Sequence, residues 1–174
     1  MLYSFDNWEP TVGNESYVSE TAIVIGHVRI GRNCYIGHGA ILRGDYGCIE
    51  VGSGSAVEEG AVLHAPPEQT CRLGQRVTIG HGAVVHSQEI GDDAVIGMGS
   101  VVSIRAVIGP RSIVAEGAVV PMEKEFPQDV VIAGNPAKIL RDIRQKDVDH
   151  WQWGKQLYMD LARKYLQIGM HRVG

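Results

Sequence analysis

Three of the seven histidines in this chain, His64, His81 and His86, lie close enough in the sequence to belong to one metal site. Imidazole nitrogens bind Zn²⁺ at about 2.0–2.1 Å, and a set of three leaves one coordination position for water. On zinc the pKa of that water falls to about 7, so hydroxide is available at neutral pH to attack an electrophilic carbon. Whether the three side chains can meet at one ion depends on the elements that carry them.

An aliphatic residue recurs along most of the chain, usually at steps of six residues. This period fits neither an isolated helix, at 3.6 residues per turn, nor a simple strand, at 2. It is typical of a parallel β-helix, in which each hexad supplies a short strand and a corner, and the marked residue points inward. The marked positions are Val18, Val24, Ile30, Ile36, Leu42, Val51, Val57, Leu63, Leu73, Ile79, Val85, Ile90, Ile96, Val102, Ile108, Val114 and Val120.

The repeat predicts an all-β solenoid, a parallel β-helix over residues 1–137. Three hexads make one triangular coil, which gives about six coils between Val18 and Val120. Glycine often follows the marked residue, as in Ile79-Gly80, and a small residue often lies four positions after it. The sequence before Val18 is expected to cover the first coil, since an open coil end leaves strand edges unpaired.

The pattern changes after Val120. Residues 131–138, Val-Ile-Ala-Gly-Asn-Pro-Ala-Lys, are interpreted as a turn that feeds a helix. From there apolar residues recur at roughly helical spacing, which predicts a C-terminal α-helical segment over residues 138–174, packed on the solenoid. A break in this helix is expected between Asp147 and Gly154.

Composition limits the partners of the protein. The formal net charge of −4 gives no general attraction for nucleic acid or an anionic membrane. No apolar run approaches the roughly 18 residues of a membrane span, and a signal peptide is not expected at the start of the sequence. Cys34, Cys48 and Cys71 form an odd set without a CxxC pair. A disulfide framework is therefore not expected, and a cytoplasmic location is the simpler one.

The repeat predicts where the histidines lie. The residues directly after four of the marked positions should stack in one column on successive coils, and they are Arg43, His64, His86 and Ser103. Adjacent strands lie about 4.8 Å apart, so His64 and His86 can reach the same ion.

A second column should form on the preceding face, from His38, Glu59 and His81. His81 then lies across the corner from His86 and faces away from the first pair. Two ligands from one subunit and one from a neighbour would complete a set of three. A threefold assembly of triangular prisms would carry three equivalent sites of this kind.

A simpler interpretation of some histidines stays open. His38 and His81 lie in twin pentads, Ile-Gly-His-Gly-Ala, so histidine at these positions can be part of the repeat alone. His27, His38, His150 and His171 have no partner at metal spacing and are interpreted as surface or packing residues.

Several motifs together resemble the γ-class carbonic anhydrase family over roughly residues 10–145. They are Leu42-Arg43-Gly44-Asp45, the hexad that ends in His64, and the run from Ile79 to His86. The resemblance implies a left-handed β-helix and a homotrimer. It also implies a metal bound by His64 and His86 of one subunit and His81 of the next, with Zn²⁺ as the ion and Fe²⁺ or Co²⁺ as alternative native metals. The loop Pro67-Glu68-Gln69 looks most like the phenylacetate-degradation and carnitine-operon proteins, some of which hydrolyse CoA thioesters.

The resemblance also implies roles for the charged residues near the histidines. Arg43 would pair with an acidic group across the interface, which Glu59 can supply, and Asp45 would help to order the site. The family usually has Gln-Asp where this chain has Glu58-Glu59, so Glu58 adds a negative charge near the metal-bound water and can accept its proton.

The residue used by the archetypal enzyme for proton transfer is absent. Its place after the aspartate of the Arg-x-Asp motif is taken by Tyr46, and Glu68 is the acidic candidate in the loop after His64. Rapid CO₂ hydration is therefore not expected.

The predicted function is attack by metal-bound water or hydroxide on CO₂ or on a small carbonyl substrate such as an acyl-CoA thioester. The protein would then be a carbonic anhydrase-like lyase or an acyl-CoA thioesterase. One alternative is a hexapeptide acyltransferase, in which one of the three histidines acts as a base and no metal is needed. Another is a non-catalytic trimer subunit that binds metal. Metal analysis distinguishes the acyltransferase from the predicted function. Activity assays distinguish the non-catalytic subunit from it.

Overall fold

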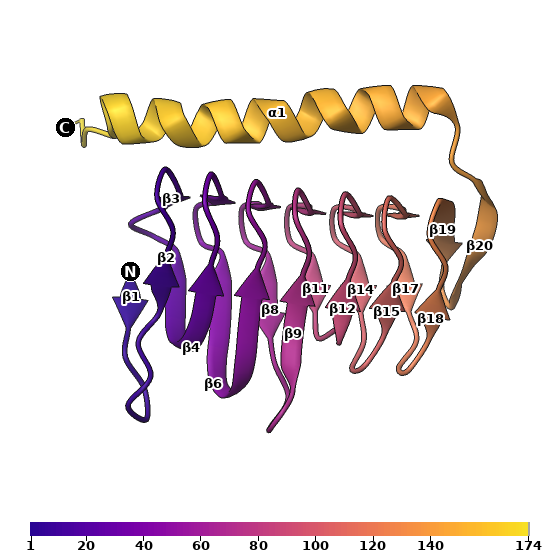
Figure 1. Cartoon of the computed structure of the whole chain (residues 1–174), viewed down its shortest axis with the longest axis horizontal. Coiled ribbons are helices and arrows are strands. Elements are labelled where there is room, and N and C mark those ends of the chain that lie inside the picture. The colour runs from indigo at the N-terminus through magenta and orange to yellow at the C-terminus, as the bar shows by residue number, and fades with distance from the viewer. Residues whose placement is uncertain (174) are drawn as a thin grey trace.

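The six-residue period becomes a stack of triangular coils in the computed structural model, which describes residues 1–173 (Figure 1). Every marked aliphatic residue except Val18 is buried, and Val18 packs against the same core. Seven parallel strands follow one another along one face, so the solenoid has about seven turns. The predicted all-β solenoid, a parallel β-helix with a C-terminal helix, is confirmed.

One face, called the helix face here, is an 8-stranded sheet that lies under the C-terminal helix. Its outward residues include aromatic and aliphatic side chains, which the helix can cover. Its strands are β3 (Tyr17–Val18), β5 (Tyr35–Ile36), β7 (Ala56–Val57), β10 (Thr78–Ile79), β13 (Val95–Ile96), β16 (Ile113–Val114), β19 (Val130–Gly134) and β20 (Ala137–Asp142).

The other two faces form a 12-stranded sheet that bends around a corner of the triangle. Strands β4 (Ile23–Ile30) and β6 (Ile41–Val51) are long because they run through this corner. The first half of β6 pairs with β8 (Val62–His64), and its second half pairs with β9 (Thr70–Leu73). The two faces are therefore continuous only at the early coils.

The first of these faces is called the aliphatic face, and the second the charged face. After β8, the aliphatic face continues with β11 (Val84–Val85), β14 (Val101–Val102) and β17 (Val119–Val120). After β9, the charged face continues with β12 (Glu89–Ile90), β15 (Val107–Ile108) and β18 (Glu125–Phe126). At the other end of the stack, β1 (Leu2–Tyr3) and β2 (Thr11–Val12) pair with β4 and cover the open edge.

The outward residues distinguish the two faces. On the charged face, Glu50 accepts from Arg29 and Arg72 on the neighbouring strands, at 3.0 Å each. On the aliphatic face an apolar residue points outward from every coil, and Val84 is 37% exposed. These residues, called the apolar stripe, are Ile23, Ile41, Val62, Val84, Val101 and Val119.

The C-terminal segment differs from the sequence prediction in two ways. Residues 137–142 form β20, which pairs antiparallel with β19 and closes the last coil, so the expected turn into a helix is a hairpin. The helix α1 (Gln145–Ile168) begins after this hairpin and is unbroken. The expected break was wrong because one glycine, Gly154, costs a helix only about 1 kcal/mol relative to alanine, and the packing of α1 on the solenoid stabilises the helix. Among residues 1–173, no helix has the length and apolar character needed to cross a membrane.

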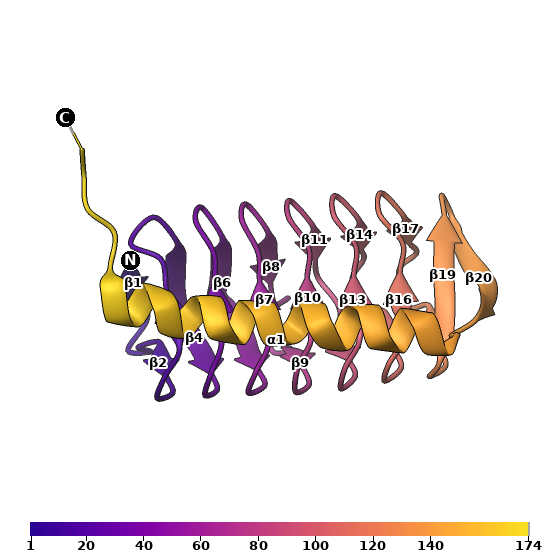
Figure 2. The same cartoon turned by 90° about the horizontal axis from the view of Figure 1, so that it is seen from above.

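Helix α1 runs back along the solenoid, from the β19–β20 hairpin to the N-terminal coils (Figure 2). Its second half packs on β3, β5 and β7. There Tyr165 stacks on Tyr17 at a ring distance of 4.5 Å, and Tyr158 packs on Tyr35 at 5.2 Å. The first half of α1 extends over the later coils, where a cavity lies beneath it.

Candidate metal centre

His64 and His86 lie side by side at the same edge of the aliphatic face. Val62 and Leu63 of β8 pair in parallel with Val84 and Val85 of β11, so the residues that follow these pairs are neighbours. The two imidazole ring centres are 4.8 Å apart, with the rings inclined at 68°. Arg43 is in register with His64 on the preceding strand. The first predicted column is thus confirmed.

One nitrogen of His64 is held by a carboxylate and the other has no partner. Nε2 lies 3.1 Å from Oδ1 of Asp45. Nδ1 is buried and makes no hydrogen bond with any of the described residues. Buried imidazole nitrogens are usually hydrogen-bonded, and a metal-binding histidine typically donates its other N–H to a carboxylate. This arrangement suits an ion at Nδ1, with Asp45 fixing the ring.

Asp45 is held in turn by Arg43, whose Nη1 lies 2.6 Å from Oδ2. Burial raises the pKa of Asp45, but the hydrogen bonds from Arg43 and His64 outweigh it and leave the pKa below its usual value. Asp45 is therefore ionised at neutral pH. Within one chain the partner of Arg43 is thus Asp45, and the expected pairing with Glu59 of a neighbouring subunit stays a prediction.

His86 favours its neutral form. Burial lowers its pKa, and electrostatic repulsion from the neighbouring His64 and Arg43 acts in the same direction. Neutral imidazole is the form that binds a metal. The pair of histidines can therefore supply two lone pairs at neutral pH.

His81 lies at the opposite edge of the aliphatic face, in the corner that leads from β10 to β11. Its Nδ1 is 2.8 Å from Glu59, and its Nε2 is 3.1 Å from Glu58. The second predicted column is confirmed, since Glu59 and His81 are in contact on successive coils. Within residues 1–173, no three His, Cys, Asp or Glu side chains of one chain are arranged to hold an ion. A single chain thus carries the two parts of the predicted site on separate edges.

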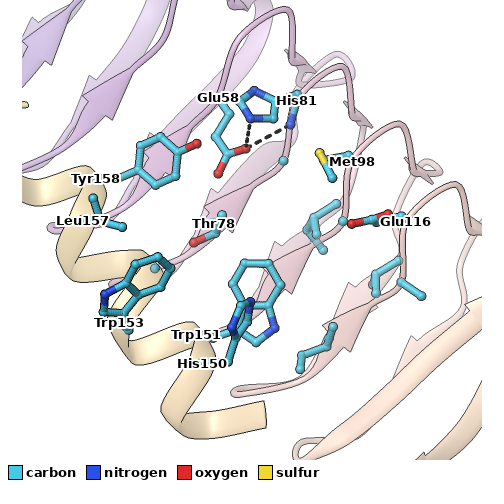
Figure 3. A pocket seen from close by; sticks show the side chains of 17 residues that line it. Glu58, Thr78, His81, Met98, Glu116, His150, Trp151, Trp153, Leu157 and Tyr158 are labelled. Carbon is cyan, nitrogen blue, oxygen red and sulfur yellow. Dashed lines mark hydrogen bonds and ion pairs between the residues drawn. The ribbon is translucent and has the colours of Figure 1, made fainter. Parts of the chain in front are cut away.

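Glu58 and Glu59 point in different directions and differ in acidity. Burial raises the pKa of Glu58, whose carboxylate also accepts the backbone N–H of His81 at 3.2 Å and faces the hydroxyl of Tyr158 (Figure 3). Burial also raises the pKa of Glu59, but a 2.6 Å hydrogen bond from Tyr35 and other contacts leave it below the usual value. In one chain Glu58 lies on the helix-face side of His81, away from the His64–His86 pair.

Glu68 lies in the loop that follows His64. This loop and Asp45, together with Tyr46, line a polar hollow of about 290 Å³. The backbone N–H of Glu68 donates to the carbonyl of Tyr46 at 3.2 Å, and the Tyr46 side chain is 70% exposed. Glu68 therefore lies on the Asp45 side of His64, and no role in proton transfer follows from its contacts.

Two of the remaining histidines pack as the sequence indicates. His38 contacts the hydroxyl of Ser19 at 2.6 Å and that of Tyr165 at 3.3 Å. His27 stacks on Trp8 at a ring distance of 3.8 Å.

The cavity beneath α1 was not predicted from the sequence. It has a volume of about 690 Å³ and is bounded by Glu58 and His81 at one end and by the first half of α1 on its outer side. Lys155 of α1 is buried close to it, with Nζ 3.5 Å from Oγ1 of Thr78. Helical spacing predicts that the apolar residues of the C-terminal segment lie on the buried side of a helix. The cavity itself arises only from the position of that helix over the coils.

Known proteins resemble this chain over nearly its whole length. Residues 27–65 and 71–103 match the family model described as the hexapeptide repeat of succinyl-transferase. The chain is 37% identical over 161 residues to the carnitine operon protein CaiE of Proteus sp. (strain LE138), which covers 92% of this chain and 82% of CaiE. It is 32% identical over 169 residues to the mitochondrial gamma carbonic anhydrase 2 of Arabidopsis thaliana, over 94% of this chain and 60% of that protein. A crystal structure of a hexapeptide transferase family protein from Anaplasma phagocytophilum has a TM-score of 0.90 and 34% identity, over 95% of this chain and 98% of that one.

Proposed function

Because this chain belongs to the γ-class carbonic anhydrase-like hexapeptide-repeat family, near the carnitine operon protein CaiE, we propose that it is a homotrimeric, metal-dependent hydrolase. Each site forms between two subunits, from His64 and His86 of one and His81 of the other, and activates water against a small carbonyl substrate. The pairing of His64 with His86 carries this proposal, because the ring centres are 4.8 Å apart while Asp45 holds Nε2 of His64 and Nδ1 makes no hydrogen bond with the described residues.

The side chains around His64 fit a divalent ion. If Nε2–H donates to Asp45, the lone pair of Nδ1 is free to bind, and neutral His86 offers a second nitrogen close by. Three imidazoles suit Zn²⁺, and they also suit Fe²⁺ or Co²⁺. When bound, such an ion supplies the Lewis acidity that makes water a nucleophile near neutral pH.

The aliphatic face supports a threefold assembly. His64 and His86 lie at one of its edges and His81 at the other, with the apolar stripe between them, while α1 lies on a different face. A threefold axis parallel to the solenoid would bring one edge of each subunit to the opposite edge of the next. The same contact would bury the apolar stripe, which favours association.

His81 must release one nitrogen before it can bind an ion, because Glu58 and Glu59 each contact one. The contact with Glu58 is the longer of the two, so we infer that Nε2 is the nitrogen that binds. Glu59 then orients the ring through Nδ1, as a carboxylate does for many metal-binding histidines. Glu58 would then lie beside a water on such an ion, where a carboxylate with a raised pKa is suited to accept a proton.

Among carbonyl substrates, an acyl-CoA thioester suits this site better than CO₂. Hydrolysis of a thioester consumes one water: a C–O bond forms, the C–S bond breaks, and the thiol leaves with a proton. CO₂ hydration at high rate needs a fast path for protons to solvent, and Tyr46 occupies the position where the archetypal enzyme has an acid. Glu58 is buried, so its proton reaches solvent slowly.

Acyl transfer is a second candidate. It is favoured by the family model described as a succinyl-transferase repeat and by the similarity to a hexapeptide transferase family protein. In that case one of the three histidines would act as a base toward an acceptor, and removal of metal would leave the activity intact. A trimer subunit that binds metal without catalysis is a third.

The proposal is tested by metal analysis and molar mass on the same samples. We expect one divalent ion per subunit in protein purified anaerobically without added metal, and a molar mass of three subunits by light scattering. His86→Ala should remove most of the metal. His38→Ala is the matched control and should retain it, because His38 packs against Ser19 and Tyr165. A stable monomer with full metal content, or full metal content in both variants, would contradict the proposal.

A further inference from the structure

The cavity beneath α1 begins at the proposed metal site. Glu58 and His81 form one end of it, and it extends along the later coils under the first half of the helix. Trp151, Trp153 and Leu157 of α1 line its outer side (Figure 3). A molecule bound in this cavity would therefore have one end next to His81.

The walls are largely apolar, and the nearby amine of Lys155 lies against Thr78 and the carbonyl of Ala94. Ile96, Met98 and Ile113 line the solenoid side, opposite the two tryptophans. The polar side chains are Glu58, His81 and Tyr158 at the inner end, with Thr78, Glu116 and His150. None of the described residues that line the cavity is lysine or arginine. Phosphate or carboxylate groups are thus disfavoured inside, whereas an uncharged apolar group is favoured.

Two large apolar side chains border the cavity and are exposed. Trp153 is 64% exposed and Leu157 is 46% exposed, both near the middle of α1. Covering apolar surface of this kind is favourable by about 25 cal/mol per Å². A ligand that fills the cavity would contact both.

We propose that this cavity binds the apolar acyl group of a CoA thioester, with the thioester carbonyl at the Glu58–His81 end and the phosphates of CoA outside. The inference rests on the proposed function, in which His81 belongs to the metal site. A volume of about 690 Å³ is much larger than an acetyl group requires. Acyl groups of medium length, or those that carry a ring, are therefore the expected substrates.

The first test is a chain-length series on the wild-type trimer. Ethyl-, butyl- and hexyl-CoA thioethers cannot be hydrolysed, so their affinities can be measured by titration calorimetry. Each methylene that enters the cavity should tighten binding about fourfold. An affinity that does not change from ethyl to hexyl would overturn the proposal. Binding of the simple salt hexanoate as tightly as hexyl-CoA would also overturn it, because the cavity should reject a carboxylate.

The second test fills the cavity. Gly154 lines it, and a Cβ built there has Trp151 as its nearest neighbour at 3.8 Å, so a side chain can be added without a clash at its base. In Gly154→Leu the affinity for the CoA thioethers should no longer depend on the length of the alkyl chain. Gln156→Leu adds the same side chain at an exposed position of the same helix and should preserve the wild-type dependence. An unchanged dependence in Gly154→Leu would overturn the proposal.

Metal content and molar mass are measured on every sample, which separates this inference from the proposed function. If the wild type is trimeric and binds metal but its affinity for the thioethers does not depend on alkyl chain length, only the proposal about the cavity is contradicted. If the affinity depends on alkyl chain length but the protein contains no metal, only the proposal of a metal-dependent hydrolase is contradicted.

Discussion

The buried amine of Lys155 provides a quantitative test of the packing between α1 and the solenoid. Its side chain is 5% exposed, and Nζ contacts the carbonyl of Ala94 at 3.3 Å and Oγ1 of Thr78 at 3.5 Å, both long for hydrogen bonds. Burial lowers the pKa of Lys155 to about 8. Asp93 and Glu58 act against this shift, and Arg76 adds to it.

The sign of the pH dependence of stability follows from the pKa of Lys155 in the unfolded and in the folded chain. The unfolded chain binds the lysine proton up to about pH 10.5, whereas the folded chain loses it at about pH 8. The free energy of unfolding therefore rises as the pH increases between these values. Below pH 8 the folded state bears the full cost of burying the charged amine of Lys155. A difference of 2.5 pKa units corresponds to about 3 kcal/mol, of which about 2 to 3 kcal/mol is recovered between pH 7 and 10.

The substitution Lys155→Met keeps the length of the side chain and removes the charge. We expect the free energy of unfolding at pH 7 to rise by about 1 to 2 kcal/mol, since the loss of two weak hydrogen bonds offsets part of the gain. The advantage of the variant should shrink as the pH rises and vanish or reverse by pH 10. Urea denaturation at pH 7, 8, 9 and 10, at one fixed subunit concentration, measures this.

The control is Lys164→Met on the same helix, because Lys164 is exposed. Its difference from the wild type should not depend on pH over this range. If the stability of Lys155→Met runs parallel to that of the wild type from pH 7 to 10, the amine is not desolvated, and the packing of α1 described here is wrong.

Three further outcomes are expected. Asp45→Asn should weaken metal binding about 10–100-fold in a chelator competition, because the carboxylate orients His64, and unchanged affinity would argue against that role. Val84→Asp should shift the molar mass by light scattering from three subunits toward one, whereas Val107→Asp on the charged face should not, and equal behaviour of the two would exclude the aliphatic face as the interface. Stopped-flow CO₂ hydration by the metal-loaded trimer should be slower by about 10²–10⁴ than with an acidic shuttle in place, and fast, buffer-dependent turnover would refute this.

The regular part of the chain was predictable because each coil repeats the same geometry. Once the inward residues are assigned, the register of the coils follows, and so does the contact between His64 and His86. The same logic placed Glu59 beside His81. The period of the repeat alone was sufficient to predict these contacts.

The irregular part was not predictable in the same way. Residues 137–142 have apolar side chains at spacings that suit a helix, yet they pair with β19 because the last coil offers an unpaired edge. Gly154 suggests a helix break, but a single glycine costs only about 1 kcal/mol, and α1 continues through it. The direction of Glu58, toward α1 rather than toward His64, depends on the position of Tyr158, which is distant in sequence.

The path of α1 affects how the molecule unfolds. In a solenoid each coil contacts only its neighbours, so the two ends can open independently, and a local loss of structure can spread coil by coil. Here the chain leaves the last coil, crosses the stack and stacks Tyr165 on Tyr17 in the first. The C-terminal helix therefore links both ends of a linear array into a closed loop of contacts. Opening either end also requires detachment of the helix, which makes the early coils sensitive to events at the far end of the chain.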